Sequence, residues 1–302
     1  MRLLVMGANG QVGWELSRSL LPLGEVIALD RCQCDLSRPE RLPALIRSIN
    51  PDVIVNAAAY TAVDKAEDEE ALAMIVNGTA VGVLAEEARI AGAFLVHYST
   101  DYVFDGTKKA PYTEEDAPNP INAYGRSKLA GETAVRQVAG GAYIILRTSW
   151  VYAARGNNFV QTVLRLARER EELRIVGDQV GAPTWGRNIA DATALIVRTI
   201  CRERTEGQFE SGLFNLTASG DTSWYGFAET ILEQASEHLG SRNEGPKLQS
   251  ISSVEYPLAA ARPRNSRLTS ERLLTRFGIV LPNWQRALAL CMQDIVTFLE
   301  HR

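Results

Sequence analysis

The sequence predicts an α/β protein built on a Rossmann-type, doubly wound parallel sheet with a smaller C-terminal lobe. In the first half of the chain, short continuous apolar runs alternate with segments of helical periodicity, the pattern of a parallel sheet covered on both faces. The first apolar run also leads directly into a glycine cluster that opens the first helix. After about residue 150 the alternation becomes looser. We therefore expect a first domain at residues 1–150 and a lobe at residues 151–302 that is interleaved with it.

Five mainly apolar runs are the expected strands, and segments with apolar residues at helical spacing separate them. Gly24 ends the first of these helices, and Asn50-Pro51 closes the second. The strands are expected at residues 2–7, 25–30, 52–59, 93–100 and 142–152, and the helices at 11–24, 38–51, 69–92 and in the segment around Tyr124 that runs to residue 138. In the second half we expect helices at 156–171, 189–204, 226–240 and from about residue 283, an extended stretch at 173–184, and a turn-rich stretch with one strand at 205–224.

The bulk composition narrows the class of protein. The chain has 302 residues, 46% of them hydrophobic, which allows a large buried core. Its net charge of −4 and its lack of a basic run argue against a nucleic-acid partner. The N-terminal apolar run is too short for a signal sequence, and we expect no membrane span. These observations together predict a cytoplasmic protein.

The cysteines and histidines do not form a metal-binding pattern. No Cys-x-x-Cys spacing occurs, and the three histidines are scattered along the chain. We therefore expect free thiols in a reducing cytoplasm and no structural zinc site. The residues concerned are Cys32, Cys34, Cys201, Cys291, His97, His238 and His301.

The glycine cluster "GANGQVG" lies between the first expected strand and the first expected helix. Gly7 permits a tight turn, Gly10 lets a pyrophosphate approach the backbone, and Gly13 lets the helix pack closely on the strand. The free N–H groups and positive dipole of the helix N-terminus favour phosphate binding. The spacing is GxxGxxG rather than the usual GxGxxG, and an ordinary turn is the alternative interpretation. Its position in the chain favours a dinucleotide site.

The end of the second strand bears on the choice of cofactor. Asp30 stands where a carboxylate can bind the adenosine ribose hydroxyls, which favours NADH. Arg31 follows it and could hold a 2′-phosphate, which favours NADPH. Asp35 and Leu36 could cover the adenine, and the small residues of "NAAAYT" would let the cofactor lie against the third strand. The expected cofactor is therefore NADPH or NADH.

Tyr124 and Lys128 are four residues apart in an expected helix, so they share one face. A phenol is a poor acid or base at neutral pH, and a nearby ammonium would favour the phenolate. Ser99 and Thr100 end the fourth strand and could hold a substrate carbonyl. These residues together predict hydride transfer to a ketone with proton delivery by Tyr124. A surface tyrosine packed on a lysine stem is the alternative.

On these motifs the chain resembles the extended short-chain dehydrogenase/reductases, and within them the dTDP-4-dehydrorhamnose reductase family. The resemblance spans nearly the whole chain, and "STDYVFDG" with "DQVGAPT" is more specific than the glycines or the Tyr-Lys pair. It implies NAD(P)H-dependent reduction of the C4 ketone of dTDP-4-dehydro-β-L-rhamnose to dTDP-β-L-rhamnose, the last step of dTDP-L-rhamnose biosynthesis. The other matching stretches are "GANGQVGWEL", "DVIVNAAAYTAVDKAE", "HYSTDYVFDG", "YGRSKLAGE", "RTSWVY", "GNNF" and "ARPRNSRL".

The resemblance also implies roles for individual residues. Tyr124 matches the family's proton donor, Lys128 its partner, and Thr100 the hydroxyl that orients the substrate. Implied substrate contacts in the active site and the sugar-nucleotide lobe are Thr100, Asp101, Tyr124, Trp150 and Arg262. Implied cofactor contacts are Gly10, Gln11, Val12, Asp30, Asp35, Leu36, Ala59, Tyr60, Thr61, Tyr98, Tyr124 and Lys128. Trp150 as a core tryptophan and Arg262 as a surface arginine remain alternatives.

In one respect the chain departs from the family. Some members bind Mg²⁺ at a dimer interface through acids in the first helix and just after the "GAPT" stretch. Glu15 is present here, but Trp185, Gly186 and Arg187 follow "GAPT". An arginine cannot be a cation ligand. We therefore expect no metal, and the resemblance leaves a homodimer open.

Three other functions remain as alternatives. A 4,6-dehydratase of the same superfamily carries Asp-Glu after its active-site threonine, whereas Asp101 and Tyr102 follow Thr100 here. A 4-epimerase uses the same three residues but regenerates its cofactor. A non-catalytic regulatory subunit, like that of methionine adenosyltransferase, would not need the proton donor.

Overall fold

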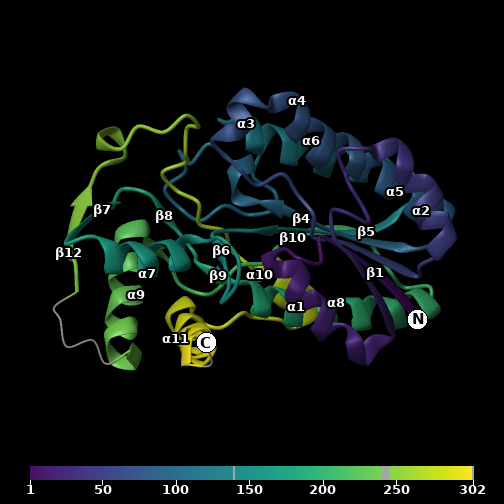
Figure 1. The fold of residues 1–302 in the computed structure, drawn as a ribbon. Helices are drawn as coiled ribbons and strands as arrows, with labels where there is room; N and C mark the ends of the chain where they lie inside the picture. Colours follow the sequence, from purple (N-terminus) through teal and green to yellow (C-terminus); the bar gives the residue numbers. More distant parts are fainter. Residues whose placement is uncertain (139, 240–244, 301–302) are drawn as a thin grey trace.

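The computed structural model describes residues 1–138, 140–239 and 245–300, and its centre is a six-stranded sheet in the order β10-β5-β4-β3-β1-β2 (Figure 1). Every neighbouring pair in this sheet is parallel. Strands are added on one side of β1 and then on the other, so the predicted doubly wound fold is confirmed. The strands are β1 (Arg2–Met6), β2 (Glu25–Leu29), β3 (Val53–Asn56), β4 (Phe94–Thr100), β5 (Ala142–Thr148) and β10 (Gly212–Asn215).

Helices cover both faces of the sheet, as the continuous apolar strands require. Alternate residues of β1 enter two different cores: Leu3 and Val5 pack with residues of α8, and Leu4 and Met6 pack with residues of α2 and α5. Figure 1 shows α1 and α8 below the sheet and α2, α5 and α6 above it. Their bounds are α1 (Gln11–Ser19), α2 (Leu42–Ile49), α5 (Ala80–Ile90), α6 (Ala123–Gln137) and α8 (Gly186–Thr205).

The long helix expected at residues 69–92 is interrupted by one π-helical turn. It consists of α4 (Glu70–Met74), the π turn η3 (Ile75–Thr79) and α5. Asn77 within the turn binds the backbone of Tyr60 and the hydroxyl of Ser127. The spacing of apolar residues along a helix gives no sign of hydrogen bonds to distant parts of the chain. The sequence therefore did not predict the π turn.

Residues 70–90 meet the length and apolarity of a membrane-spanning helix, which the sequence analysis did not anticipate. Half of that apolar window is buried inside the fold. Ala80, Leu84 and Ala88 of α5 belong to the core above the sheet. The apolar face of this helix is therefore accounted for by packing against the strands.

The fifth strand is shorter than expected. β5 ends at Thr148, and Trp150 adopts a left-handed backbone conformation with φ of 48°. The chain then forms β6 (Val151–Tyr152), which pairs with β9 (Thr184–Trp185) outside the main sheet. The run at 142–152 therefore serves two different sheets.

The second half of the chain contributes to both parts of the molecule. α8 and β10 complete the main sheet and its lower helical layer, and α10 (Glu271–Phe277) packs beside β10. The remaining segments form a smaller body around a core that includes Tyr152, Phe227 and Trp284 (Figure 1). They are α7 (Phe159–Glu169), β7 (Glu172–Val176), β8 (Val180–Gly181), β11 (Thr222–Ser223), α9 (Trp224–Leu239), β12 (Lys247–Ile251) and α11 (Trp284–Glu300).

A buried ion pair joins α6 to β5. Arg147 donates from Nε to Glu132 Oε1 over 2.7 Å and from Nη2 to Oε2 over 2.6 Å, and the two side chains are 2% and 1% exposed. Removal of one partner leaves a buried charge without compensation, which typically costs about 3–5 kcal/mol. We expect Glu132→Leu to lower the free energy of unfolding by about this amount, measured by urea denaturation.

The matched control is Glu86→Leu. Glu86 pairs with Arg89 on the exposed surface of α5. Solvent screens such a pair, so this variant should unfold at nearly the wild-type urea concentration. Equal losses in the two variants would show that the buried pair has no special weight.

Candidate functional site

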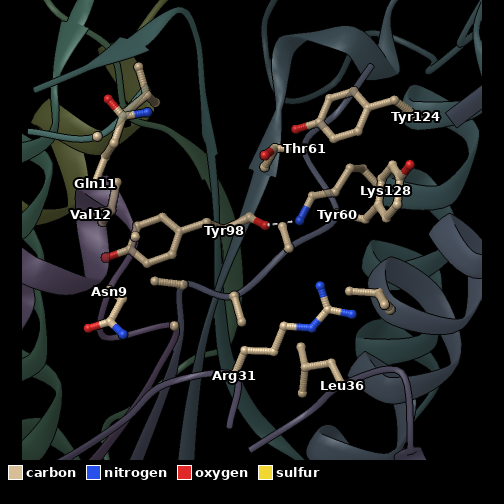
Figure 2. Close-up of a pocket in the computed structure, with 18 of the residues that line it drawn as sticks. Asn9, Gln11, Val12, Arg31, Leu36, Tyr60, Thr61, Tyr98, Tyr124 and Lys128 are labelled. Carbon is tan, nitrogen blue, oxygen red and sulfur yellow. Dashed lines mark hydrogen bonds between the residues drawn. The ribbon is translucent and has the colours of Figure 1, made fainter. Parts of the chain in front are cut away.

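A cavity of about 490 Å³ opens at the carboxyl ends of β1, β3, β4 and β5, the place where open α/β sheets bind ligands (Figure 2). Most of the predicted cofactor residues line it. They are Gly7, Gly10, Gln11, Val12, Arg31, Asp35, Leu36, Ala59, Tyr60, Thr61, Tyr98, Tyr124 and Lys128. Of the other predicted residues, Gly13, Asp30, Thr100, Asp101, Trp150 and Arg262 do not line this cavity.

The glycine turn has the geometry that its sequence suggested. Gly7 has φ of 81°, and a Cβ there would lie 2.8 Å from the backbone nitrogen of Ala58. A Cβ on Gly13 would lie 2.0 Å from the carbonyl oxygen of Gly7, so only glycine lets α1 approach β1 this closely. Gly10 is the N-cap of α1, and Gln11 and Val12 present the first turn to the cavity. The arrangement can accept an anionic group at a helix N-terminus.

The side chains of Asp30 and Arg31 differ in how accessible they are to a ligand. The Asp30 carboxylate accepts hydrogen bonds from the backbone of Cys32 and Gln33 and from the Asn9 amide, at 2.9, 3.2 and 3.0 Å. Arg31 lines the cavity with a side chain that is 79% exposed, and its Nε lies 3.7 Å from Asp35 Oδ1. Arg31 is therefore the more accessible of the two groups toward a ligand.

Lys128 reaches across from α6 to β4. Its Nζ donates to the backbone carbonyl of Tyr98 over 2.6 Å, and Figure 2 shows this contact as a dashed line. The side chain is 3% exposed, and burial lowers the pKa of Lys128 to about 8, against an opposing effect of Glu132. The ammonium is thus fixed in place, and its pKa of about 8 is close to neutral pH.

Burial has the opposite effect on Tyr124. It raises the pKa of Tyr124 to about 12, while a hydrogen bond with Thr100 lowers the pKa and the charge of Asp101 raises it. The spacing of Tyr124 and Lys128 in the sequence predicted that the ammonium would favour the phenolate. In the structure burial dominates instead, so Tyr124 stays protonated at neutral pH and can act as an acid.

Thr100 and Asp101 lie behind the cavity wall, at the end of β4 and the start of the 3₁₀ turn η4 (Asp101–Val103). Thr100 Oγ1 donates to Asp101 Oδ1 over 3.0 Å and accepts from the backbone of Tyr102 over 3.2 Å. Burial raises the pKa of Asp101 to about 7. The structure therefore brings Thr100 to the Tyr124 hydroxyl and buries Asp101 beneath both.

Arg262 and Trp150 are held by other side chains. Arg262 forms two hydrogen bonds with the Asp64 carboxylate, at 3.0 and 2.7 Å, so its charge already has a partner. This pair lowers the pKa of Asp64. The Trp150 ring stacks on the ring of Trp224 with a centroid separation of 3.6 Å. Neither predicted substrate residue belongs to the cofactor-sized cavity.

Arg187 lies just after the "GAPT" stretch, where the resemblance places an acidic metal ligand. Arg187 Nη1 lies 4.0 Å from Asp294 Oδ2. Burial raises the pKa of Glu15, and the nearby Arg187 charge lowers it. Within the described ranges, no three His, Cys, Asp or Glu side chains gather in a way that could hold a metal ion.

Several cavity residues were given no role in the sequence analysis. They come from the loop at 156–157, whose only signal was the "GNNF" motif, from the glycine turn, from the end of β5 and the start of β6, and from the segments after Asp30 and around α4 and η3. Gly156 lies against Gln11: a Cβ on Gly156 would be 3.6 Å from the Cγ of Gln11. The residues without an assigned role are Asn9, Cys34, Leu72, Val76, Thr148, Val151, Gly156 and Asn157, whereas Ala57 and Ala58 belong to the "NAAAYT" stretch that was expected to lie against the cofactor.

Comparisons with known proteins agree with the geometry. Residues 1–297 match the family model described as the RmlD substrate binding domain. The chain is 53% identical to a dTDP-4-dehydrorhamnose reductase of Burkholderia thailandensis over 98% of this chain and 100% of that protein.

Solved structures give the same result. The fold is similar to the crystal structure of a dTDP-4-dehydrorhamnose reductase from Clostridium acetobutylicum, with a TM-score of 0.86, 35% identity, and coverage of 98% and 99% of the two chains. It is also similar to the Bacillus anthracis enzyme in complex with NADP, with a TM-score of 0.85, 34% identity, and coverage of 97% and 99%. On the family match and the full-length identity, the chain belongs to the dTDP-4-dehydrorhamnose reductase family.

Proposed function

We propose that this protein reduces the C4 ketone of dTDP-4-dehydro-β-L-rhamnose to dTDP-β-L-rhamnose with NADPH or NADH. The observation that carries the proposal is one cavity lined by Tyr124 and Lys128 together with the glycine turn and Arg31, with Thr100 behind the wall beside Tyr124. Membership of the family supports the choice of substrate. The similar Bacillus anthracis enzyme is described in complex with NADP, which supports the choice of cofactor.

The cavity fits a nicotinamide dinucleotide. Gly7 and Gly10 line the cavity without a side chain, and the first turn of α1 would offer N–H groups to a pyrophosphate. Arg31 and Leu36 line the same cavity and would hold the adenine end of the cofactor, and Lys128 would hold the nicotinamide ribose. The cofactor, when bound, supplies the hydride.

The side chains around Tyr124 would manage the proton. Tyr124 would donate its proton to the C4 oxygen, and the Thr100 hydroxyl would hold that oxygen in line by turning its one proton from Asp101 to the oxygen when the substrate binds. Lys128 would bind the nicotinamide ribose, because its ammonium is fixed by the Tyr98 carbonyl. Asp101 lies beneath Thr100 and orients its hydroxyl through the 3.0 Å hydrogen bond.

We infer a division of labour along the chain. Residues 1–150 would hold the dinucleotide, and residues 151–302 would supply the sugar-nucleotide lobe, although α8 and β10 of that half complete the main sheet. We also propose that the protein works in the cytoplasm without a divalent metal, because Arg187 supplies a positive charge beside Asp294.

The reaction itself is tested by stoichiometry. Purified protein with NADPH and dTDP-4-dehydro-β-L-rhamnose should oxidise one nicotinamide for each dTDP-β-L-rhamnose formed. The assay is run in EDTA, so a metal requirement would appear as lost activity. Turnover of the sugar without consumption of NADPH would instead identify an epimerase or a dehydratase.

Tyr124→Phe removes only the proposed proton donor. We expect kcat to fall by about 10²–10⁴, because that is the usual contribution of a general acid. The dissociation constant for NADPH should stay near the wild-type value. Tyr143→Phe is the control. Tyr143 lies near the start of β5, at the end of the strand away from the cavity, so this variant should keep full activity. A Tyr124→Phe enzyme with normal turnover would exclude this tyrosine as the donor.

Arg31→Ala tests the adenine end of the cavity. We expect kcat/KM to fall more for NADPH than for NADH, since only NADPH has a 2′-phosphate that the guanidinium can bind. Arg38→Ala removes a nearby arginine that does not line the cavity, and it should change neither value greatly. Equal losses for the two cofactors in Arg31→Ala would contradict this role.

The pH profile tests Lys128. Its pKa is lowered to about 8, so the ammonium is lost as the pH rises through that value. We expect kcat/KM to fall on the alkaline side with an apparent pKa near 8. Asp101 titrates nearby, at about 7, so a variant is needed to assign the limb. In Lys128→Arg the alkaline fall should move to higher pH, because a guanidinium stays charged. An unmoved limb would assign it to another group.

A further inference from the structure

The backbone at Trp150 is in a conformation that bulky residues rarely adopt. Its φ is 48°, and Asn50 is the other described residue apart from glycine with a positive φ. Such strain persists only where the surroundings determine it, and it is concentrated at functional sites. Thr148 and Val151, on either side of Trp150, both line the reaction cavity. The strained residue therefore lies at the edge of the site that carries the proposed chemistry.

Two groups hold the Trp150 indole. On one face it stacks on Trp224, with ring planes 5° apart and centroids separated by 3.6 Å. On the Nε1 side it lies against Gly181, where a Cβ would come within 2.5 Å of the indole Cε2. Only glycine at position 181 leaves room for the ring. Trp150 as a whole residue nevertheless remains partly exposed.

Both groups belong to one small structural unit. β8 and β11 are antiparallel, with Thr222 opposite Gly181 and Ser223 opposite Val180, so Trp224 follows directly after the pair. Phe159 of α7 packs against the Trp224 ring at a centroid distance of 4.6 Å. The position of Trp224 is thus set by the smaller body, and the position of Trp150 follows from it.

The same strand leads back to the reacting hydroxyls. The Val180 N–H donates to the carbonyl of Arg264, and the Ser266 N–H donates to the carbonyl of Val180, both over 2.8 Å. The buried Ser266 side chain lowers the pKa of Asp101, and Asp101 in turn accepts from Thr100. β8 therefore fixes the indole of Trp150 relative to the hydroxyl that would orient the substrate.

We propose that Trp224 is a positioning residue, which holds the Trp150 indole as a rigid wall against the sugar ring of the substrate. The sugar is the part concerned, because Thr148, two residues before Trp150, lines the cavity and pairs with Thr100 at the ends of β5 and β4, where the C4 carbonyl would lie, whereas Trp150 itself lies outside the cavity. Trp224 acts through Trp150 and does not line the cavity itself. This inference rests on the proposed function for the identity of the ligand.

The test is the variant Trp224→Leu. Loss of the stacked ring should raise KM for the sugar nucleotide about three- to tenfold, in line with the usual strength of an aromatic pair. KM for NADPH and kcat should change less than twofold, on the order of the error in such assays. Trp224→Phe restores a flat ring and should recover most of the affinity. An unchanged KM for the sugar, or equal losses for sugar and cofactor, would overturn the proposal.

A double-mutant cycle and a control separate positioning from general stability. Trp150→Leu should weaken sugar binding, and adding Trp224→Leu should weaken it little further, since the second residue acts through the first. Trp284→Phe changes a core tryptophan of the same body, which packs on Phe227, and should leave KM for the sugar near wild type. Fully additive effects of the two leucine variants, or an equal effect of Trp284→Phe, would contradict the proposed role.

Calorimetry keeps this test distinct from the proposed reaction. The dissociation constant of dTDP-β-L-rhamnose is measured without turnover for the wild type and Trp224→Leu. If the wild type binds the sugar nucleotide but does not reduce the ketone, the proposed function fails and the effect of Trp224 on binding is still tested. If turnover is normal and the dissociation constant is unaffected by Trp224→Leu, the positioning role fails alone.

Discussion

The hydrogen bond from Lys128 Nζ to the Tyr98 carbonyl is the constraint on which the site depends. It joins α6 to the end of β4 over 2.6 Å in an almost fully buried position. Because Tyr124 lies one turn before Lys128, fixing the lysine also fixes the phenol against Thr100. One turn later, Glu132 joins the same helix to Arg147 of β5. A single helix face is thus anchored to two neighbouring strands at the place where the strands end.

The π turn η3 extends this anchoring to the loop after β3. Asn77 accepts from the Tyr60 N–H over 2.8 Å and donates to Ser127 of α6 over 2.9 Å. A Cβ on Gly131 would lie 2.2 Å from the Asn77 carbonyl, so α6 and the turn approach as closely as glycine allows. The loop that lines the cavity at Ala59–Thr61 and the helix that bears Tyr124 therefore form one unit.

Much of this could be predicted from the sequence, because the determining signals are local. Continuous apolar runs predicted the buried parallel strands, and the glycines, the residues at the strand ends and the Tyr-Lys spacing predicted about half of the cavity wall. Gln11, Val12 and Tyr98 were expected only from the resemblance to the family. The missing parts depend on contacts between distant residues. Arg262 pairs with Asp64, 198 positions earlier in the chain. Asn9 donates a hydrogen bond to the carboxylate of Asp30, 21 positions later. The break at Trp150 likewise depends on Gly181 and Trp224, which no local pattern connects to it.

Burial also explains why the electrostatics differ from the simple expectation of a lysine that activates a tyrosine. The same low-dielectric surroundings raise the pKa of Tyr124 to about 12 and lower that of Lys128 to about 8, since each charged form loses its hydration. A reductase gains from this arrangement. Its tyrosine must hold a proton until hydride addition creates an alkoxide, and an alkoxide is a strong enough base to take the proton from a phenol that water does not ionise at neutral pH. The direction of the shift therefore suits proton donation better than proton abstraction.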